Sequence, residues 1–93
     1  MDITMFLNDN MRVLDYLYSK RDDEDFIRVS QQEVAEYFDL SRPTINRIFK
    51  ALKENGYLLS DERYNCKYKI TEKSLYIVEK MRSIWGDIYY GLG

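Results

Sequence analysis

The sequence of 93 residues contains no histidine, one cysteine and one proline. Histidine is the side chain that most often moves protons near neutral pH, so its absence excludes histidine-based acid–base catalysis. The single thiol, Cys66, cannot form a disulfide within the chain. Without histidine it also leaves too few ligands for a structural zinc site. We therefore expect no metal and no other cofactor, and a reducing, cytoplasmic compartment.

Long apolar runs are absent as well. No segment approaches the roughly 18 apolar residues that a membrane-spanning helix needs, and residues 1–10 lack the basic start of a secretory signal. We therefore expect neither a membrane span nor a signal peptide. Hydrophobic residues make up 45% of the chain and glycine only four positions. This composition and length are typical of one folded domain.

Positive charge is in slight deficit, with a formal net charge of −2 and an isoelectric point near 5.1. Taken as a total, this argues against a nucleic-acid partner. However, residues 1–41 carry ten acids and four bases, whereas residues 42–82 carry ten bases and five acids. Such segregation predicts an interaction surface formed by the second half of the chain.

Hydrophobic periodicity and turn residues predict a chain that is mainly α-helical with a small β-hairpin, an α+β arrangement. The order is helix, strand, helix, helix, strand, strand, helix. The expected elements are helices at about 4–19, 31–38, 42–55 and 72–90, with strands at about 26–29, 57–60 and 67–70.

Local signals set the boundaries of the two central helices. Ser30 and Glu33 have the spacing of a capping box at the start of the first. Ser41 is a second N-cap, followed by Pro43 in the first turn, where a missing N–H costs nothing. Gly56 suits the left-handed position that ends the second helix.

Residues 31–55 form a helix-turn-helix pattern. Apolar side chains at Ile45, Ile48, Phe49 and Leu52 predict the buried stripe of the second helix. The opposite face is polar and basic, and this helix has no acid before Glu54. Arginine and asparagine pair with guanine and adenine edges, while lysine neutralises phosphate. The pattern therefore predicts contact with double-stranded DNA.

The stretches SQQEVAEYF and LSRPTINRIFKALKENGYL, with the hairpin that follows, resemble winged helix-turn-helix DNA-binding domains of bacterial regulators. They are similar both to Crp/Fnr-type domains and to MarR-like regulators. The resemblance implies that residues 1–93 form a single winged-helix domain. Helix 42–55 would enter the major groove, and a wing at 57–70 would place residues 61–67 near the backbone or the minor groove. One departure is Asp39, which stands where the family usually has glycine.

The predicted DNA contacts come from the start of helix 31–38, from helix 42–55 and from the wing. They are Gln31, Gln32, Ser41, Arg42, Pro43, Thr44, Asn46, Arg47, Lys50, Lys53, Arg63, Tyr64, Asn65 and Lys67. Plainer alternatives stay open. The helix bases could be ordinary surface charges, the wing bases could simply be solvated beside Asp61 and Glu62, and Tyr64 could pack on the hairpin.

The last helix carries two apolar seams rather than one. Together they span about half of its circumference, wider than the stripe of a helix that packs on one side. One seam can cover the core, and the other would leave an exposed apolar patch on a monomer. We therefore predict a homodimer formed through Ile77, Met81, Ile84, Trp85 and Ile88. Coverage of both seams by the first helix is the alternative.

The leading hypothesis is a dimeric transcriptional repressor that binds a specific DNA sequence. One alternative is a DNA-binding protein of plasmid or phage partition or replication, and another is a winged-helix protein-interaction module without DNA binding. An enzyme is not expected. Glu33 and Glu36 could suggest a pair of catalytic carboxylates. However, the capping box explains Glu33, and no third polar group joins the pair. For Cys66 an inert thiol and a redox sensor both remain open.

Overall fold

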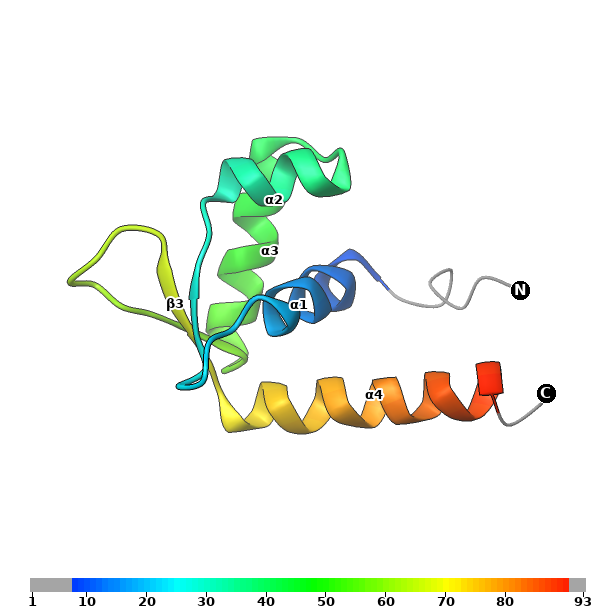
Figure 1. Ribbon diagram of the computed structural model, residues 1–93. Coiled ribbons are helices and arrows are strands. Elements are labelled where there is room, and N and C mark those ends of the chain that lie inside the picture. Colours follow the sequence, from blue (N-terminus) through cyan, green and yellow to red (C-terminus); the bar gives the residue numbers. More distant parts are fainter. Residues whose placement is uncertain (1–7, 91–93) are drawn as a thin grey trace.

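The computed structural model describes residues 8–90, with side chains described up to Ile84. A helix pair lies at one end of the molecule, a small sheet with a long hairpin lies beside it, and the last helix extends along the other end (Figure 1). The expected order of elements is confirmed. The elements are α1 (Asp9–Ser19), β1 (Phe26–Arg28), α2 (Gln31–Phe38), α3 (Arg42–Glu54), β2 (Leu58–Ser60), β3 (Lys67–Ile70) and α4 (Glu72–Tyr90).

The start of the first helix is where the prediction was wrong. Helix α1 begins at Asp9 rather than near Thr4, because Asn8 is extended and its side chain accepts a hydrogen bond from the N–H of Met11 at 2.9 Å. An asparagine cap of this kind ends the helical hydrogen-bond pattern on its N-terminal side. Residues 4–7 lie outside the described part of the chain.

The boundaries of α2 and α3 follow the predicted capping signals. The hydroxyl of Ser30 accepts from the N–H of Glu33 at 3.0 Å, and the Glu33 carboxylate accepts from the N–H of Ser30 at 3.5 Å. The hydroxyl of Ser41 accepts from the N–H of Thr44 at 3.3 Å. Helix α3 ends one residue before the predicted Asn55, and Gly56 has the predicted left-handed φ of +78°.

The turn between α2 and α3 depends on Asp39, whose φ of 55° lies in the left-handed region. Aspartate tolerates this region better than most residues, which is why the turn forms without glycine. The N–H of Leu40 donates to the carbonyl of Ala35 at 3.0 Å and closes the end of α2. The chain is thereby redirected, so that α3 packs across α2 (Figure 1).

The hydrophobic core packs against the apolar side of α3. The predicted stripe of Ile45, Ile48, Phe49 and Leu52 is buried. The Phe49 ring meets the ring of Tyr68 edge-on at a centroid distance of 5.2 Å. Side chains from every other element complete this core, namely Val13, Leu14, Leu17, Ile27, Val34, Ala35, Leu58, Ile70 and Val78.

The three strands form one antiparallel sheet in the order β1–β3–β2, so β1 and β2 are its edge strands. Ile27 pairs with Tyr68, and Leu58 pairs with Ile70. Alternation along a strand puts these residues on the core side and their neighbours, such as Phe26 and Lys69, on the outer side.

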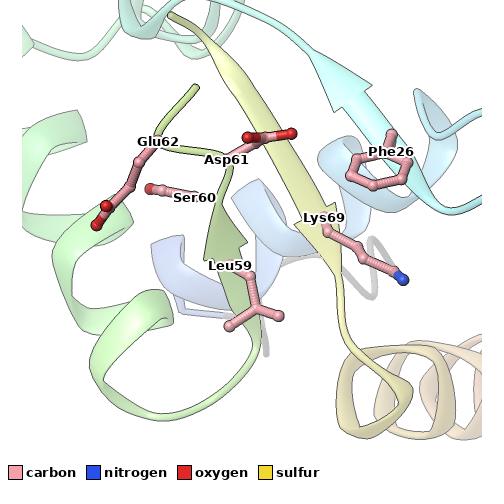
Figure 2. A pocket seen from close by; sticks show the side chains of 6 residues that line it. All are labelled: Phe26, Leu59, Ser60, Asp61, Glu62 and Lys69. Atoms are coloured by element: carbon pink, nitrogen blue, oxygen red, sulfur yellow. The ribbon is translucent and has the colours of Figure 1, made fainter. Parts of the chain in front are cut away.

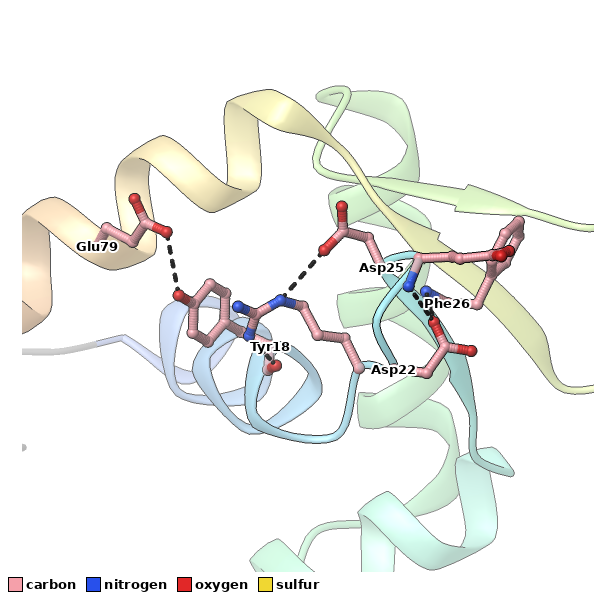
Figure 3. Close-up of polar contacts among 7 residues, drawn as sticks. Tyr18, Asp22, Asp25, Phe26 and Glu79 are labelled. Carbon is pink, nitrogen blue, oxygen red and sulfur yellow. Dashed lines mark hydrogen bonds and ion pairs between the residues drawn. The ribbon is translucent and has the colours of Figure 1, made fainter.

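Helix α4 is attached to α1 by polar contacts centred on Tyr18 (Figure 3). The Tyr18 hydroxyl donates to the carboxylate of Glu79 at 3.2 Å. The Arg82 guanidinium lies 4.5 Å from the Tyr18 ring centre and donates to Asp15 at 2.8 Å. Val78 is buried against the core, so these contacts fix which side of α4 faces the domain.

The acidic connector between α1 and β1 is exposed but folded. The carboxylate of Asp22 accepts from the N–H of Glu24 at 2.8 Å and from the N–H of Phe26 at 3.0 Å (Figure 3). These donors favour the ionised form, so the Phe26 and Glu24 amides hold the pKa of Asp22 below its ordinary value.

We expect the left-handed conformation of Asp39 to decide how substitutions behave there. Because a β-carbon strains this conformation, the Asp39→Gly protein should be more stable than the Asp39→Ala protein by about 1 kcal/mol. Urea unfolding of both variants measures the difference. Equal unfolding free energies would show that the turn relaxes to another conformation.

The hydrogen bonds of Asp22 predict an acid-sensitive connector. A depressed pKa in the folded state means that the contribution is present above the unfolded pKa and is lost as the pH falls through the folded pKa. The melting temperature of the native protein should therefore fall more steeply below about pH 4 than that of Asp22→Asn. If Tm falls equally with pH in the native protein and in Asp22→Asn, this role for Asp22 is contradicted.

Candidate nucleic-acid interface

The basic face of α3 points outward because the apolar stripe on its other face is buried in the core. The side chains of Asn46, Arg47, Lys50 and Lys53 are exposed, as the helical spacing predicts. No acidic residue precedes Glu54 on this helix. The structure therefore presents a positively charged ridge with one amide among the cations.

The first turn of α3 holds Arg47 through a hydroxyl pair. The Ser41 hydroxyl donates to the Thr44 hydroxyl at 2.8 Å, and the Arg47 Nη2 donates to the same Thr44 oxygen at 3.4 Å. Thr44 is half-buried, whereas Ser41 and Arg47 are exposed. Thr44 therefore orients the arginine as well as lying on the predicted surface.

A shallow hollow of about 310 Å³ separates this part of α3 from the first turn of α1. Asp9 and Asn10 line it together with Thr44 and Arg47. Sequence reasoning missed these two residues, because no local pattern indicates that the start of α1 packs beside the third helix.

The start of α2 adds further polar groups to the same surface. Gln31 donates to the amide oxygen of Asn46 at 3.5 Å, and Arg42 donates to the amide oxygen of Gln32 at 3.1 Å. Gln31, Arg42, Pro43 and Asn46 line a hollow of about 450 Å³. The structure thus brings together the residues predicted on two different helices.

The hairpin tip is organised by Asp61. Its carboxylate accepts from Arg63 Nε at 3.2 Å, from Nη2 at 3.3 Å and from the backbone N–H at 3.1 Å. The guanidinium holds the pKa of Asp61 below its ordinary value, and the carboxylate raises the pKa of Arg63. The Arg63 side chain nevertheless stays 78% exposed, so it is a cation presented on a rigid support.

The other predicted wing residues differ in availability. Lys67 is the least accessible, because its side chain is 18% exposed and its amine lies 4.5 Å from the Phe26 ring centre and 4.8 Å from that of Tyr64. Tyr64 therefore packs on the hairpin, yet 49% of it remains exposed. Asn65 is exposed at the tip.

The outer face of the sheet has a separate shallow hollow of about 380 Å³ (Figure 2). Phe26 and Leu59 give it an apolar floor, and Lys69, Asp61 and Glu62 give it a charged rim. On the opposite, core-facing side Tyr68 is half-buried, and burial raises the pKa of its hydroxyl.

The predicted dimerisation residues of α4 fall into two groups. Ile77 and Met81 are half-buried, and Ile84 is 55% exposed. The side chains of Trp85 and Ile88 lie outside the described residues. Val78 belongs to the core, and Leu75 and Ile77 pack against it. Of the described residues predicted at the interface, Ile84 is therefore the most exposed.

No group of three or more histidine, cysteine, aspartate or glutamate side chains is placed to hold a metal ion in residues 8–84. No helix of the described chain has the length and apolar character to cross a membrane.

Solved structures with the same fold come from MepR of S. aureus. A MepR mutant is 21% identical with a TM-score of 0.73, covering 97% of this chain and 65% of that one. A MepR–DNA complex is 20% identical with a TM-score of 0.68, covering 98% and 65%. A MepR mutant bound to an oligodeoxyribonucleotide is 19% identical with a TM-score of 0.70, covering 98% and 66%. The chain therefore shares a winged-helix fold with MepR and spans about two thirds of its length.

No curated protein matches the chain in sequence. The model of the Crp-like helix-turn-helix domain matches residues 11–73, from α1 through the wing to the first turn of α4. This match covers more than half of the chain and confirms the resemblance carried by the helix-turn-helix and the hairpin. The chain belongs to the Crp-like helix-turn-helix domain family.

Proposed function

We propose that this chain is a sequence-specific, double-stranded DNA-binding transcriptional regulator that acts as a dimeric repressor. The observation that carries the proposal is the exposed face of α3, which holds four bases and no acid between Arg42 and Lys53. It stands in a helix-turn-helix whose second helix is free to enter a major groove. Structures of MepR bound to DNA share this fold.

In the proposed complex α3 lies in the major groove. Arg42, Asn46 and Arg47 read base edges, because guanidinium and amide groups form paired hydrogen bonds with guanine and adenine. Lys50 and Lys53 contact phosphates. The start of α2 and Ser41 hold the DNA backbone, which fixes the register of the helix in the groove.

The wing makes a second contact. Arginine has five N–H donors, and Asp61 accepts two of those in the Arg63 side chain. The remaining donors of this exposed guanidinium are available to phosphates or to the minor groove. Tyr64 and Asn65 follow Arg63 at the hairpin tip, and the Lys67 amine packs against the Tyr64 ring.

The proposed dimer forms through α4. The residues are Ile77, Met81 and Ile84, with Trp85 and Ile88 further along the helix. A two-fold axis would set the two α3 helices roughly one DNA turn, about 34 Å, apart. Occupation of such an operator competes with polymerase, which is the proposed basis of repression.

Arg47→Ala tests the base-reading role. We expect it to weaken binding to the selected sequence by about 1–3 kcal/mol and to relax base preference at one position of each half-site. Fluorescence anisotropy on a selected and a random duplex measures both effects. Unchanged affinity for the selected duplex would remove Arg47 from the reading surface.

Lys50→Ala is the matched comparison on the same helix face. Because a phosphate contact carries no sequence information, binding to both duplexes should weaken equally and the salt dependence should become shallower by about one unit of slope. A native protein that binds no random duplex even at low salt would instead support the protein-interaction module. Cooperative filling of repeated sites would support partition or replication.

Ile84→Glu tests the dimer, because a buried glutamate without a partner is costly at an apolar contact. Analytical ultracentrifugation should show a dimer for the native protein and a monomer for Ile84→Glu. Ser83→Glu, which adds the same charge at an exposed position on another face of the helix, is the matched control and should stay a dimer. A native monomer, or an Ile84→Glu dimer, would contradict an interface through this face.

A further inference from the structure

The exposed side of α2 carries a chain of hydrogen bonds that ends on α3. The Gln32 Nε2 donates to the Glu36 carboxylate at 2.8 Å. The Arg42 Nη1 donates to the Gln32 Oε1 at 3.1 Å. All three side chains are exposed, so these contacts lie on the surface and not in the core. Arg42 lines a hollow with Asn46, which connects them to the proposed DNA-binding face of α3.

These two hydrogen bonds can run in only one direction. A carboxylate only accepts hydrogen bonds, and a guanidinium only donates them. The amide of Gln32 therefore satisfies both neighbours in one orientation alone, with its nitrogen toward Glu36 and its oxygen toward Arg42. Reversing the amide would place two acceptors together at Glu36 and two donors together at Arg42.

The fold brings the three residues together. Gln32 and Glu36 are four residues apart on α2, which places them on the same helix face one turn apart. Arg42 is the first residue of α3. It returns to Gln32 because the left-handed Asp39 redirects the chain between the helices.

We propose that Glu36, acting through Gln32, is a positioning residue that holds the Arg42 guanidinium for base reading. This inference rests on the proposed DNA-binding function and identifies part of its specificity. Gln32 accepts one of the five arginine donors, so the Nε and Nη2 edge stays free for the paired acceptors of a guanine. Arg42 also lines a hollow with Asn46, so the held guanidinium lies beside a second base-reading side chain.

Holding Arg42 in the free protein lowers the cost of ordering it when DNA binds. This role explains why the acidic Glu36 lies on a surface whose other charges favour DNA. By charge alone, neutralising Glu36 would strengthen binding to every duplex. The positioning role predicts weaker discrimination instead, so the two explanations give different results for one variant.

The experiment compares Glu36→Ala, Gln32→Ala and Arg42→Ala with the native protein. Alanine is used at position 36 because a glutamine there would still offer an amide oxygen to Gln32. Glu54→Ala, which removes another exposed glutamate, is the matched charge control. Binding is measured on the duplex that the native protein selects and on a random duplex. Thermal unfolding of each variant confirms that it folds.

We expect Glu36→Ala to lower the ratio of selected to random affinity by about three- to tenfold, with Gln32→Ala having a similar effect. Base preference should relax at the same position as in Arg42→Ala, and Glu36→Ala should add nothing in the Arg42→Ala background. Glu54→Ala should leave the ratio unchanged.

An unchanged ratio in both Glu36→Ala and Gln32→Ala would overturn the proposal, as would additive effects of Glu36→Ala and Arg42→Ala. These outcomes leave the proposed function standing, because the native protein still selects a sequence. A native protein that selects no sequence would refute the proposed function itself.

Discussion

The buried stripe of α3 is the constraint on which the rest of the structure depends. Ile45, Ile48, Phe49 and Leu52 are buried against side chains from every other element. Their burial fixes the rotation of α3 about its own axis, because turning the helix would expose apolar surface and bury charge. The basic face is therefore directed outward by hydrophobic packing, and the polar residues contribute little to that choice.

Packing sets the positions of the helices and the hairpin, and polar contacts then orient the arginine side chains on them. Thr44 orients Arg47, Gln32 orients Arg42, and Asp61 orients Arg63. In each case a long, flexible cation is held by a neutral or acidic acceptor. Arginine side chains lose much rotamer freedom on binding, so prior orientation favours association with a specific partner. The modest net charge of −2 is consistent with specificity that depends on a few held side chains.

Most of the fold could be predicted because its signals are local. The capping box, the Ser41 cap, the left-handed Gly56 and the apolar spacing each act within a few residues, and the structure has them where they were expected. The start of α1 could not be predicted well, since several apolar residues before Asn8 continue the helical pattern while the cap ends the helix. The low exposure of Lys67 could not be predicted either, because Phe26, whose ring lies beside its amine, is about 40 residues earlier in the chain.

The sequence by itself determined the order of the elements, the basic face of α3 and the acidic and basic halves, since these follow from spacing and composition. Only the tertiary structure decided which side chains meet across elements. Asp9 and Arg47 line one hollow although they belong to different helices. The Tyr18 hydroxyl donates to Glu79 on α4, and Gln32 links Glu36 to Arg42 on α3. The physical reason is that helix orientation follows from burial of the whole core, which no single segment specifies.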